Sequence, residues 1–238
     1  MDGHKTAGMP HLSSDLLEER IGYRFKDRYL LQCALTHTSF ANEQRIRNCE
    51  DYERLEFLGD AVLEMVSSAF LYTRYPGAKE GEMTRLRASL VCEAALAYCA
   101  KDFGLSDFIR LGKGEEAGGG RAKESIISDV CEALIGAIYL DSGGIECPRE
   151  FIYRFILSDL ENKRLFYDAK SKLQEYIQQQ NGTIEYRLLE ESGPGHMKHF
   201  VVSAVVNGEE RTVGEGRSKK EAEQNAAFEV LKQIRDIS

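Results

Sequence analysis

The first 165 residues alternate between stretches with apolar residues at helical spacing and short polar breaks. Helical periodicity runs through Leu16–Ser39, Tyr52–Tyr72, Met83–Asp102 and Ile126–Leu140, and a last helix is expected from Arg149 to about Leu165. The breaks, YPGAKEGE, LGKGEEAGGGR and DSGG, are typical of turns and loops. No stretch here shows the period-two alternation of a strand, so we expect this part to be entirely helical.

The pattern changes after ENKRLFYDAK. A helix, KSKLQEYIQQQ, precedes three strand-like runs, TIEYRLLEES, HFVVSAVVNGEE and RTVGEGRS, and an alanine-rich helix, KKEAEQNAAFEVLKQI, follows them. This α-β-β-β-α order over about 70 residues is within the size range of an independent small domain. We therefore predict a flexible N-terminal tail at 1–13, a helical domain at 14–162, a linker at 163–168 and an α+β domain at 169–237.

Four carboxylates share one side of the helix expected over Tyr52–Tyr72. At about 100° per residue the acids fall in one sector, and four apolar residues fall in the opposite sector, which we expect to face the core. The acids are Glu53, Glu56, Asp60 and Glu64, and the apolar residues are Leu55, Leu58, Val62 and Met65. A solvated acidic face is the ordinary interpretation. Against it, no lysine lies on this helix, and like charges four residues apart repel.

Gly59 lies in the middle of the same helix. Glycine costs about 1 kcal/mol relative to alanine at such a position. We therefore expect that something approaches the backbone closely at Gly59.

A second acidic pair lies in SIISDVCEALIGAIYL. Asp129 and Glu132 are three residues apart and so share a face of an otherwise apolar helix, where burying them is costly unless they are paired or bind a metal. Carboxylate oxygens suit hard cations such as Mg²⁺. A helical di-iron site would need Glu-x-x-His pairs, which none of the five histidines supplies. We therefore prefer Mg²⁺, with Mn²⁺ able to substitute.

Composition points to a globular protein of the cytoplasm. The first residues, MDGHKTAGMP, are polar, no run approaches the roughly 18 apolar residues that cross a bilayer, and six cysteines occur without a CxxC pair. We expect reduced thiols and no membrane association.

The net charge of -8, taken alone, argues against a nucleic-acid partner. Basic residues nevertheless cluster in GRSKKEAEQ, where Lys219 and Lys220 begin the final helix and Ser218 is a candidate N-cap with Glu221 three residues later. A helix N-terminus favours phosphate. An exposed basic helix start without a ligand is the alternative.

Motifs in both parts of the chain resemble one known family. HTSFANEQ, ERLEFLGDAVLEM, EGEMTRLRASLV and SIISDVCEALIGAIYLD are similar, in this order, to the bacterial ribonuclease III catalytic domain. SKLQEYIQ, GPGHMKHFVV and GEGRSKKEAEQNAA are similar to the double-stranded-RNA-binding domain that follows it. The resemblance covers roughly residues 14–237. It implies an all-helical ribonuclease III endonuclease domain followed by a small α-β-β-β-α double-stranded-RNA-binding domain.

The resemblance also implies an activity. It is that of a Mg²⁺-dependent endoribonuclease, a hydrolase that cuts both strands of double-stranded RNA by metal-activated water. The expected products have 5′-phosphate and 3′-hydroxyl ends with short 3′ overhangs. The expected substrates are ribosomal RNA precursors and other structured transcripts.

Site residues follow by position from the resemblance. The metal-site acids are Glu56, Asp60, Asp129 and Glu132, with Glu80 of KEGE as a further acid and with Asp60 and Glu132 as catalytic residues. Glu53 corresponds to a residue linked to substrate handling and the dimer, whereas Glu64 has no such role and is expected to face solvent. Phe57 falls beside the acids, and the resemblance implies that it inserts into a second subunit of a homodimer, which supplies two sites for two strands. The alternative is that Phe57 packs beneath HTSF.

The resemblance further assigns contacts with RNA. Lys219 and Lys220, next to Ser218, would bridge major-groove phosphates, while residues of the preceding helix and the GPGHMKH loop would meet two minor grooves. The minor-groove residues are Ser171, Gln174, Glu175 and His196. Arg121 and Lys123 of GGGRAKES are expected to touch the RNA backbone, although such a glycine-rich segment is ordinarily only a connection.

Two other classes of protein are alternatives to this hypothesis. A non-catalytic RNA-binding regulator with the same fold would lack one of the metal-site acids, and all of them are present. A helical metal-storage protein would need histidines that are missing and would leave the lysines at 219 and 220 unexplained.

Overall fold

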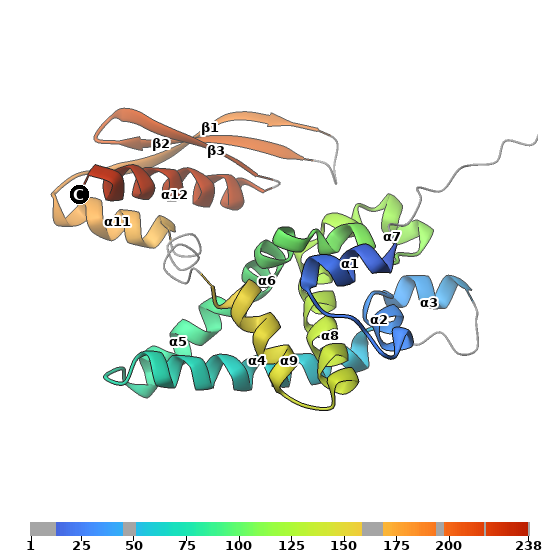
Figure 1. Ribbon diagram of the computed structural model, residues 1–238. Helices are drawn as coiled ribbons and strands as arrows, with labels where there is room; N and C mark the ends of the chain where they lie inside the picture. Colours follow the sequence, from blue (N-terminus) through green and yellow to red (C-terminus); the bar gives the residue numbers. More distant parts are fainter. Residues whose placement is uncertain (1–12, 45–50, 159–168, 194–197, 217, 238) are drawn as a thin grey trace, which may run out of the picture. The chain divides into compact units, whose positions relative to one another are not determined.

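The computed structural model of the protein describes residues 13–44, 51–158, 169–193, 198–216 and 218–237. The chain divides into two units, Met1–Leu157 and Ser158–Ser238, and each is described by itself (Figure 1). The tail expected at 1–13, apart from Ser13, lies outside the described residues, as do the linker expected at 163–168 and His196.

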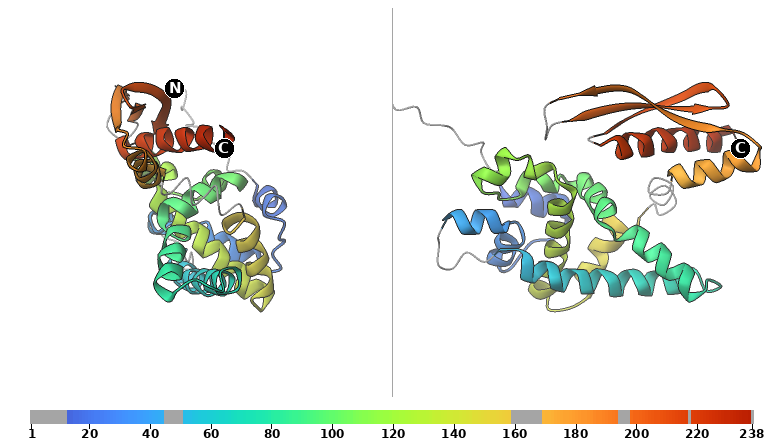
Figure 2. Two further views of the ribbon diagram at one scale, coloured as in Figure 1. Left: turned by 90° about the vertical axis from the view of Figure 1, so that its left-hand side faces the viewer. Right: turned by 180° about the vertical axis from the view of Figure 1, so that it is seen from behind.

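The first unit is helical, as predicted, with α8 running through its middle and the long α4 crossing it (Figures 1 and 2). Its α-helices are α1 (Ser14–Ile21), α2 (Arg28–Ala34), α3 (Thr38–Gln44), α4 (Glu53–Arg74), α5 (Glu80–Leu90), α6 (Glu93–Cys99), α7 (Lys113–Ala117), α8 (Glu124–Ser142) and α9 (Glu146–Phe151). Among the described residues, the 3₁₀ turns η1 (Ala100–Phe103), η2 (Leu105–Phe108) and η3 (Gly120–Ala122) lie between α6 and α8, and a π-helical turn, η4 (Ile152–Ile156), follows α9.

Local backbone chemistry divides the helical stretches more finely than periodicity predicts. The stretch Leu16–Ser39 forms three helices, because Gly22 ends α1 at a φ of 74° and the side chain of Asp27 caps α2. The stretch Met83–Asp102 is interrupted between α5 and α6. The segment LGKGEEAGGGR was expected to be a loop, and this was wrong: it contains α7 and η3. Glu43 accepts from the backbone N–H of Lys113 at 2.9 Å and so stabilises the start of α7.

The core of this unit surrounds α8. Its buried residues include Ile126, Ile127, Val130, Cys131, Ala133, Leu134, Ile135, Ala137 and Ile138. On α4 the expectation of a core-facing Met65 was wrong, because that side chain is 54% exposed, whereas Leu63 and Val66 are buried. Compared with the predicted face, the buried face of α4 is rotated about the helix axis toward Glu56, the side on which α4 packs against α8.

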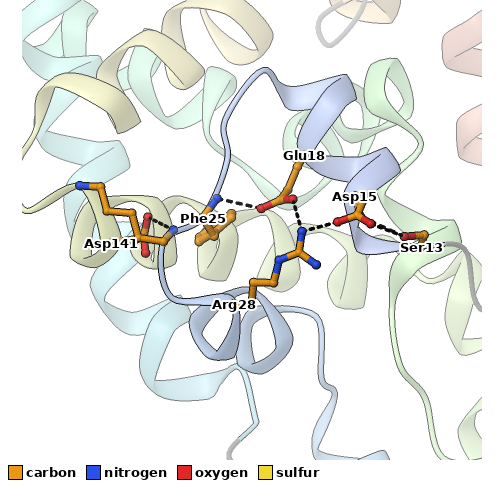
Figure 3. Close-up of polar contacts among 7 residues, drawn as sticks. Ser13, Asp15, Glu18, Phe25, Arg28 and Asp141 are labelled. Atoms are coloured by element: carbon orange, nitrogen blue, oxygen red, sulfur yellow. Dashed lines mark hydrogen bonds and ion pairs between the residues drawn. The ribbon is translucent and has the colours of Figure 1, made fainter.

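A polar network fixes the C-terminal end of α8 to the segment between α1 and α2 (Figure 3). Asp141 accepts from the Tyr23 hydroxyl at 2.7 Å and from the backbone N–H of Asp27 at 2.7 Å and of Lys26 at 3.1 Å. Burial opposes the charge, but these hydrogen bonds lower the pKa of the Asp141 carboxyl. The end of α8 is thereby tied to the turn before α2.

A second carboxylate completes this network. The buried Glu18 accepts from the backbone N–H of Phe25 at 2.8 Å and from Arg28 at 3.2 Å, and Arg28 also pairs with Asp15 (Figure 3). A buried carboxylate that receives two donors holds the ends of α1 and α2 together.

The second unit has the predicted α-β-β-β-α order. It comprises α11 (Ala169–Gln179), β1 (Ile184–Ser192), β2 (His199–Val206), β3 (Glu209–Gly216) and α12 (Lys219–Ile237). The antiparallel sheet has the order β1-β2-β3, and both helices lie on one of its faces (Figure 1). Asn207 and Gly208, with φ of 53° and 83°, form the tight turn between β2 and β3, as Asn-Gly pairs do in hairpins.

The core of the second unit joins the sheet to both helices. Leu173 and Ile177 of α11 meet alanines of α12 and Ala204 of β2. A Cβ built on Gly214 would lie 2.2 Å from the backbone N of Ala226, so β3 and α12 approach closely only because small residues face each other. In neither unit is any described helix long and apolar enough to cross a membrane.

Candidate metal centre

Two glycines set the crossing of α4 and α8. A Cβ built on Gly59 would lie 1.8 Å from the carbonyl oxygen of Glu132, and one built on Gly136 would lie 2.3 Å from that of Leu55. The expectation of a close approach at Gly59 is therefore confirmed, and the approaching group is the backbone of α8. Side chains one or two turns before these glycines are brought together as a result.

Three carboxylates meet at this crossing. One oxygen from each of Glu56, Asp129 and Glu132 lies within 4.8 Å of the others, and all three side chains are half-buried. Oxygen-only donors in this arrangement fit a hard divalent cation such as Mg²⁺ or Mn²⁺. Three of the four acids predicted on α4 and α8 are thus placed where one ion can contact both helices.

Two carboxyls at the crossing, those of Glu132 and Glu56, have raised pKa values in the protein alone. Burial, together with the charges of Asp60, Glu56 and Asp129, raises the pKa of Glu132 to about 8. Burial and the neighbouring acids also raise the pKa of Glu56. Like charges held in a partly buried place favour the protonated form, and a bound cation would reverse that preference.

Asp60 and Glu80 lie outside the three converging oxygens. Asp60 is exposed one turn beyond Glu56, close enough for its charge to raise the pKa of Glu56 and Glu132. Glu80 begins α5, is exposed, and accepts from the Thr84 hydroxyl at 2.9 Å. Glu53 is exposed in the first turn of α4, and its charge contributes to the raised pKa of Glu56.

Glu64 faces solvent as expected, with 43% of its side chain exposed, but it is also paired. Its carboxylate pairs with Arg87 of α5 at 3.3 Å, and Arg87 also donates to the Ser68 hydroxyl at 2.8 Å. The fourth acid of the motif therefore links α4 to α5. The sequence interpretation missed this pair because Arg87 lies on another helix.

Tyr52 is a second contact that was missed. Its hydroxyl donates to Asp129 Oδ2 at 3.1 Å, and burial and the charge of Asp129 raise its pKa. An aromatic residue just before a motif carries no signal of such a contact, because the two residues are 77 positions apart.

One side of α4 exposes large apolar side chains. Phe57 is 82% exposed, Met65 54% and Tyr72 73%, and the exposed Ala61 and Ala69 continue the same row. We call these five residues the α4 stripe. The alternative in which Phe57 packs beneath HTSF is excluded by its exposure, and the prediction that it lies on the exposed side is confirmed.

The RNA-contact residues assigned to the second unit are accessible where they are described. Lys219 and Lys220 are exposed in the first turn of α12, and the Ser218 hydroxyl accepts from the backbone N–H of Glu221 at 3.1 Å, as an N-cap does. On α11 the three assigned residues, Ser171, Gln174 and Glu175, are all exposed.

The two basic residues of the first unit are engaged within it. Arg121 pairs with Glu116 at 2.5 Å and donates to the Ser106 carbonyl at 2.6 Å. Lys123 pairs with Glu115 at 2.6 Å. Both charges therefore hold the segment around η3, and their contact with RNA stays a prediction.

Comparison with known proteins agrees with this geometry. Residues 27–160 match the family model described as Ribonuclease-III-like, and residues 169–234 match the Double-stranded RNA binding motif. The protein named Ribonuclease 3 from Anoxybacillus flavithermus is 45% identical over 231 residues, 96% of this chain and 97% of the relative. Ribonuclease 3 from Geobacillus thermodenitrificans is 46% identical over 222 residues, 92% of this chain and 90% of the relative.

A solved structure supports the assignment of the first unit. The nuclease domain of ribonuclease III from Campylobacter jejuni, whose description mentions structural flexibility in a region involved in dimer formation, is 42% identical and superposes with a TM-score of 0.56. The match covers 60% of this chain and 96% of that domain. The acids converge in the part of the chain that matches these nucleases, and the chain belongs to the ribonuclease III family.

Proposed function

We propose that the protein is a divalent-metal-dependent endoribonuclease that hydrolyses both strands of double-stranded RNA. The observation that carries this proposal is the convergence of Glu56, Asp129 and Glu132 within 4.8 Å at the crossing of α4 and α8. The family match supports the reaction class, and the donor set supports Mg²⁺, with Mn²⁺ as a substitute. We keep the cytoplasm as the expected location.

Each acid has a distinct task in this proposal. Glu56, Asp129 and Glu132 hold the ion from two helices, and the more exposed Asp60 stays proposed as a further metal-site acid and, with Glu132, as a catalytic residue. When bound, the ion supplies an activated water nucleophile and stabilises charge on the leaving oxygen. Glu80 stays proposed as a further metal-site acid, near a second metal ion. The proposed products carry 5′-phosphate and 3′-hydroxyl ends with short 3′ overhangs, and ribosomal RNA precursors and other structured transcripts are the proposed substrates.

The second unit is proposed to hold the duplex. Lys219 and Lys220 extend from the N-terminus of α12, where the helix dipole also attracts phosphate. The exposed side chains at 171, 174 and 175 on α11 suit the wide minor groove of A-form RNA. Contacts of this kind recognise shape rather than base sequence.

The α4 stripe is proposed as the contact between two copies of the chain. A twofold dimer places the same surface of each copy against the other, and it provides two acid clusters for two RNA strands. Replacing Phe57 by Ala should shift the protein toward the monomer in sedimentation velocity, while Leu140→Ala, a change at an exposed residue of α8, should leave the assembly unchanged. A Phe57→Ala variant that sediments like the wild type would refute this contact.

The catalytic proposal is tested with long duplex RNA, incubated with Mg²⁺ and then with chelator. Replacing Glu132 by Gln should abolish cleavage and spare duplex binding, whereas Glu19→Gln, the same change at an exposed site on α1, should affect neither. Wild-type protein that binds duplex but leaves it uncut with either Mg²⁺ or Mn²⁺ would disprove the enzyme assignment. Equal loss of binding and cleavage in the Glu132→Gln variant would indicate a structural role instead.

A further inference from the structure

Tyr52 occupies a fixed position at the start of α4. Only 5% of the residue is exposed, and its backbone N–H donates to the Thr36 carbonyl at 3.0 Å. Its own carbonyl accepts from the N–H groups of Leu55 and Glu56, each at 2.9 Å. The ring centroid lies 5.6 Å from that of His37. The backbone and ring are therefore held on several sides, so the hydroxyl has a defined location.

The Tyr52 hydroxyl is hydrogen-bonded to one of the carboxylates of the metal site. It donates to Asp129 Oδ2 at 3.1 Å, while Asp129 Oδ1 accepts from the Ser128 hydroxyl at the longer distance of 3.5 Å. A hydrogen bond to one oxygen restricts rotation of a carboxylate about its Cβ–Cγ bond. A buried tyrosine hydroxyl needs a hydrogen-bond acceptor, and any backbone carbonyl could fill that role, so burial alone does not require a carboxylate. Here the acceptor is one of the three converging carboxylates.

We propose that Tyr52 is a positioning residue of the metal site, which holds the Asp129 carboxylate in the orientation that binds the ion together with Glu56 and Glu132. This inference rests on the proposed metal-dependent function. Hydrogen-bond partners behind metal ligands orient them, and their loss typically weakens metal affinity or activity by about 10–100-fold. Tyr52 does not contact the ion in this arrangement and acts through Asp129.

The chain offers a matched control on the same helix. The hydroxyl of Tyr23 also donates to a carboxylate of α8, Asp141 Oδ2, at 2.7 Å. Asp141 is 12 residues after Asp129, which corresponds to about 18 Å along the helix axis. The variants Tyr52→Phe and Tyr23→Phe therefore remove the same atom from the same kind of bond, at opposite ends of α8.

The test measures Mn²⁺ binding to the full chain without RNA, from the electron paramagnetic resonance signal of free Mn²⁺. We expect Tyr52→Phe to raise the Kd for Mn²⁺ by about 10–100-fold and Tyr23→Phe to leave it within about twofold of the wild type. Thermal unfolding without metal checks that both variants are folded. In the cleavage assay, Tyr52→Phe should need more Mn²⁺ for half-maximal rate and regain most of the wild-type kcat at saturating Mn²⁺.

Several results would overturn the inference. It fails if Tyr52→Phe binds Mn²⁺ as tightly as the wild type, or if both phenylalanine variants lose affinity equally, which would indicate a general effect on α8. In either case the wild type still binds Mn²⁺, so the proposed function stands. If the wild type binds no Mn²⁺, the proposed metal site and the inference both fall.

Discussion

Replacing Gly59 by Ala should have an effect opposite to the one that helix propensity predicts. At an exposed mid-helix position this change stabilises a helix by about 1 kcal/mol. At Gly59 the new Cβ would lie 1.8 Å from the carbonyl oxygen of Glu132, whereas ordinary contact begins at 3.4 Å. The backbones of α4 and α8 would have to separate by the difference, at least 1.6 Å.

The cost of that separation can be bounded. Overpacking in a core lowers the free energy of unfolding by about 1–3 kcal/mol. A clash between two main chains should cost at least the upper value, because no flexible side chain can change its rotamer to relieve it. After subtracting the gain in helix propensity, we expect a net loss of about 2 kcal/mol or more. For a domain of this size that corresponds to a fall in Tm of roughly 4–8 °C. A displacement near 1 Å can cost about 100-fold in rate, so cleavage should fall at least as strongly.

Gly81→Ala is the matched control for this prediction. Gly81 lies in α5, and a Cβ there would have its nearest neighbour at 3.9 Å, the end of the Arg85 side chain. Differential scanning calorimetry and single-turnover cleavage of duplex RNA should show a destabilised, slow Gly59→Ala variant and a Gly81→Ala variant at least as stable as the wild type. A Gly59→Ala protein with unchanged or higher Tm would refute the reasoning.

Three other predictions follow from the described contacts. Glu132→Gln should flatten the pH dependence of stability without metal. The pKa of Glu132 is about 8 in the native protein and 4.5 ordinarily, so between these values the native wild type binds a proton that the unfolded chain has lost, and its Tm falls as pH rises. An equal slope of Tm against pH in both proteins would contradict this. Asp141→Ala removes the acceptor of three hydrogen bonds and should lower the free energy of unfolding by about 3 kcal/mol in urea titrations. Because the pKa of Asp141 is lowered in the native protein, the wild type should lose this advantage as pH falls below the ordinary 3.8. An unchanged midpoint of urea unfolding would be evidence against the network. The double variant Lys219→Ala, Lys220→Ala should bind unrelated RNA duplexes more weakly by the same factor. The slope of log affinity against log salt concentration, measured by fluorescence anisotropy, should decrease in magnitude by about 2. Losses confined to one duplex sequence would count against phosphate contacts.

The sequence was most informative where local spacing determines the result. The acids at 56, 129 and 132 could be chosen because residues three or four apart share a helix face, and the resemblance then named them as one site. The α-β-β-β-α order was also predictable, since strand alternation is a local signal, although the run HFVVSAVVNGEE was not divided at the Asn207–Gly208 turn.

Contacts between distant segments could not be predicted. A helical wheel shows which residues share a face but not which neighbour packs there, so Met65 was wrongly placed in the core. The crossing at Gly59 and Gly136 decides that orientation, and it depends on two helices together. The pair of Glu64 with Arg87 was missed for the same reason, as was the capping of α7 by a carboxylate of α3.

The raised pKa values at the α4–α8 crossing make ion and proton competitors for the same oxygens. A cation that enters must displace the proton that Glu132 retains, and this proton is released to the medium. The apparent affinity for the ion should therefore increase as pH rises toward about 8 and then level off. In this protein the response to divalent metal is at the same time a response to acidity, and the two can be separated only by measuring proton release alongside metal uptake.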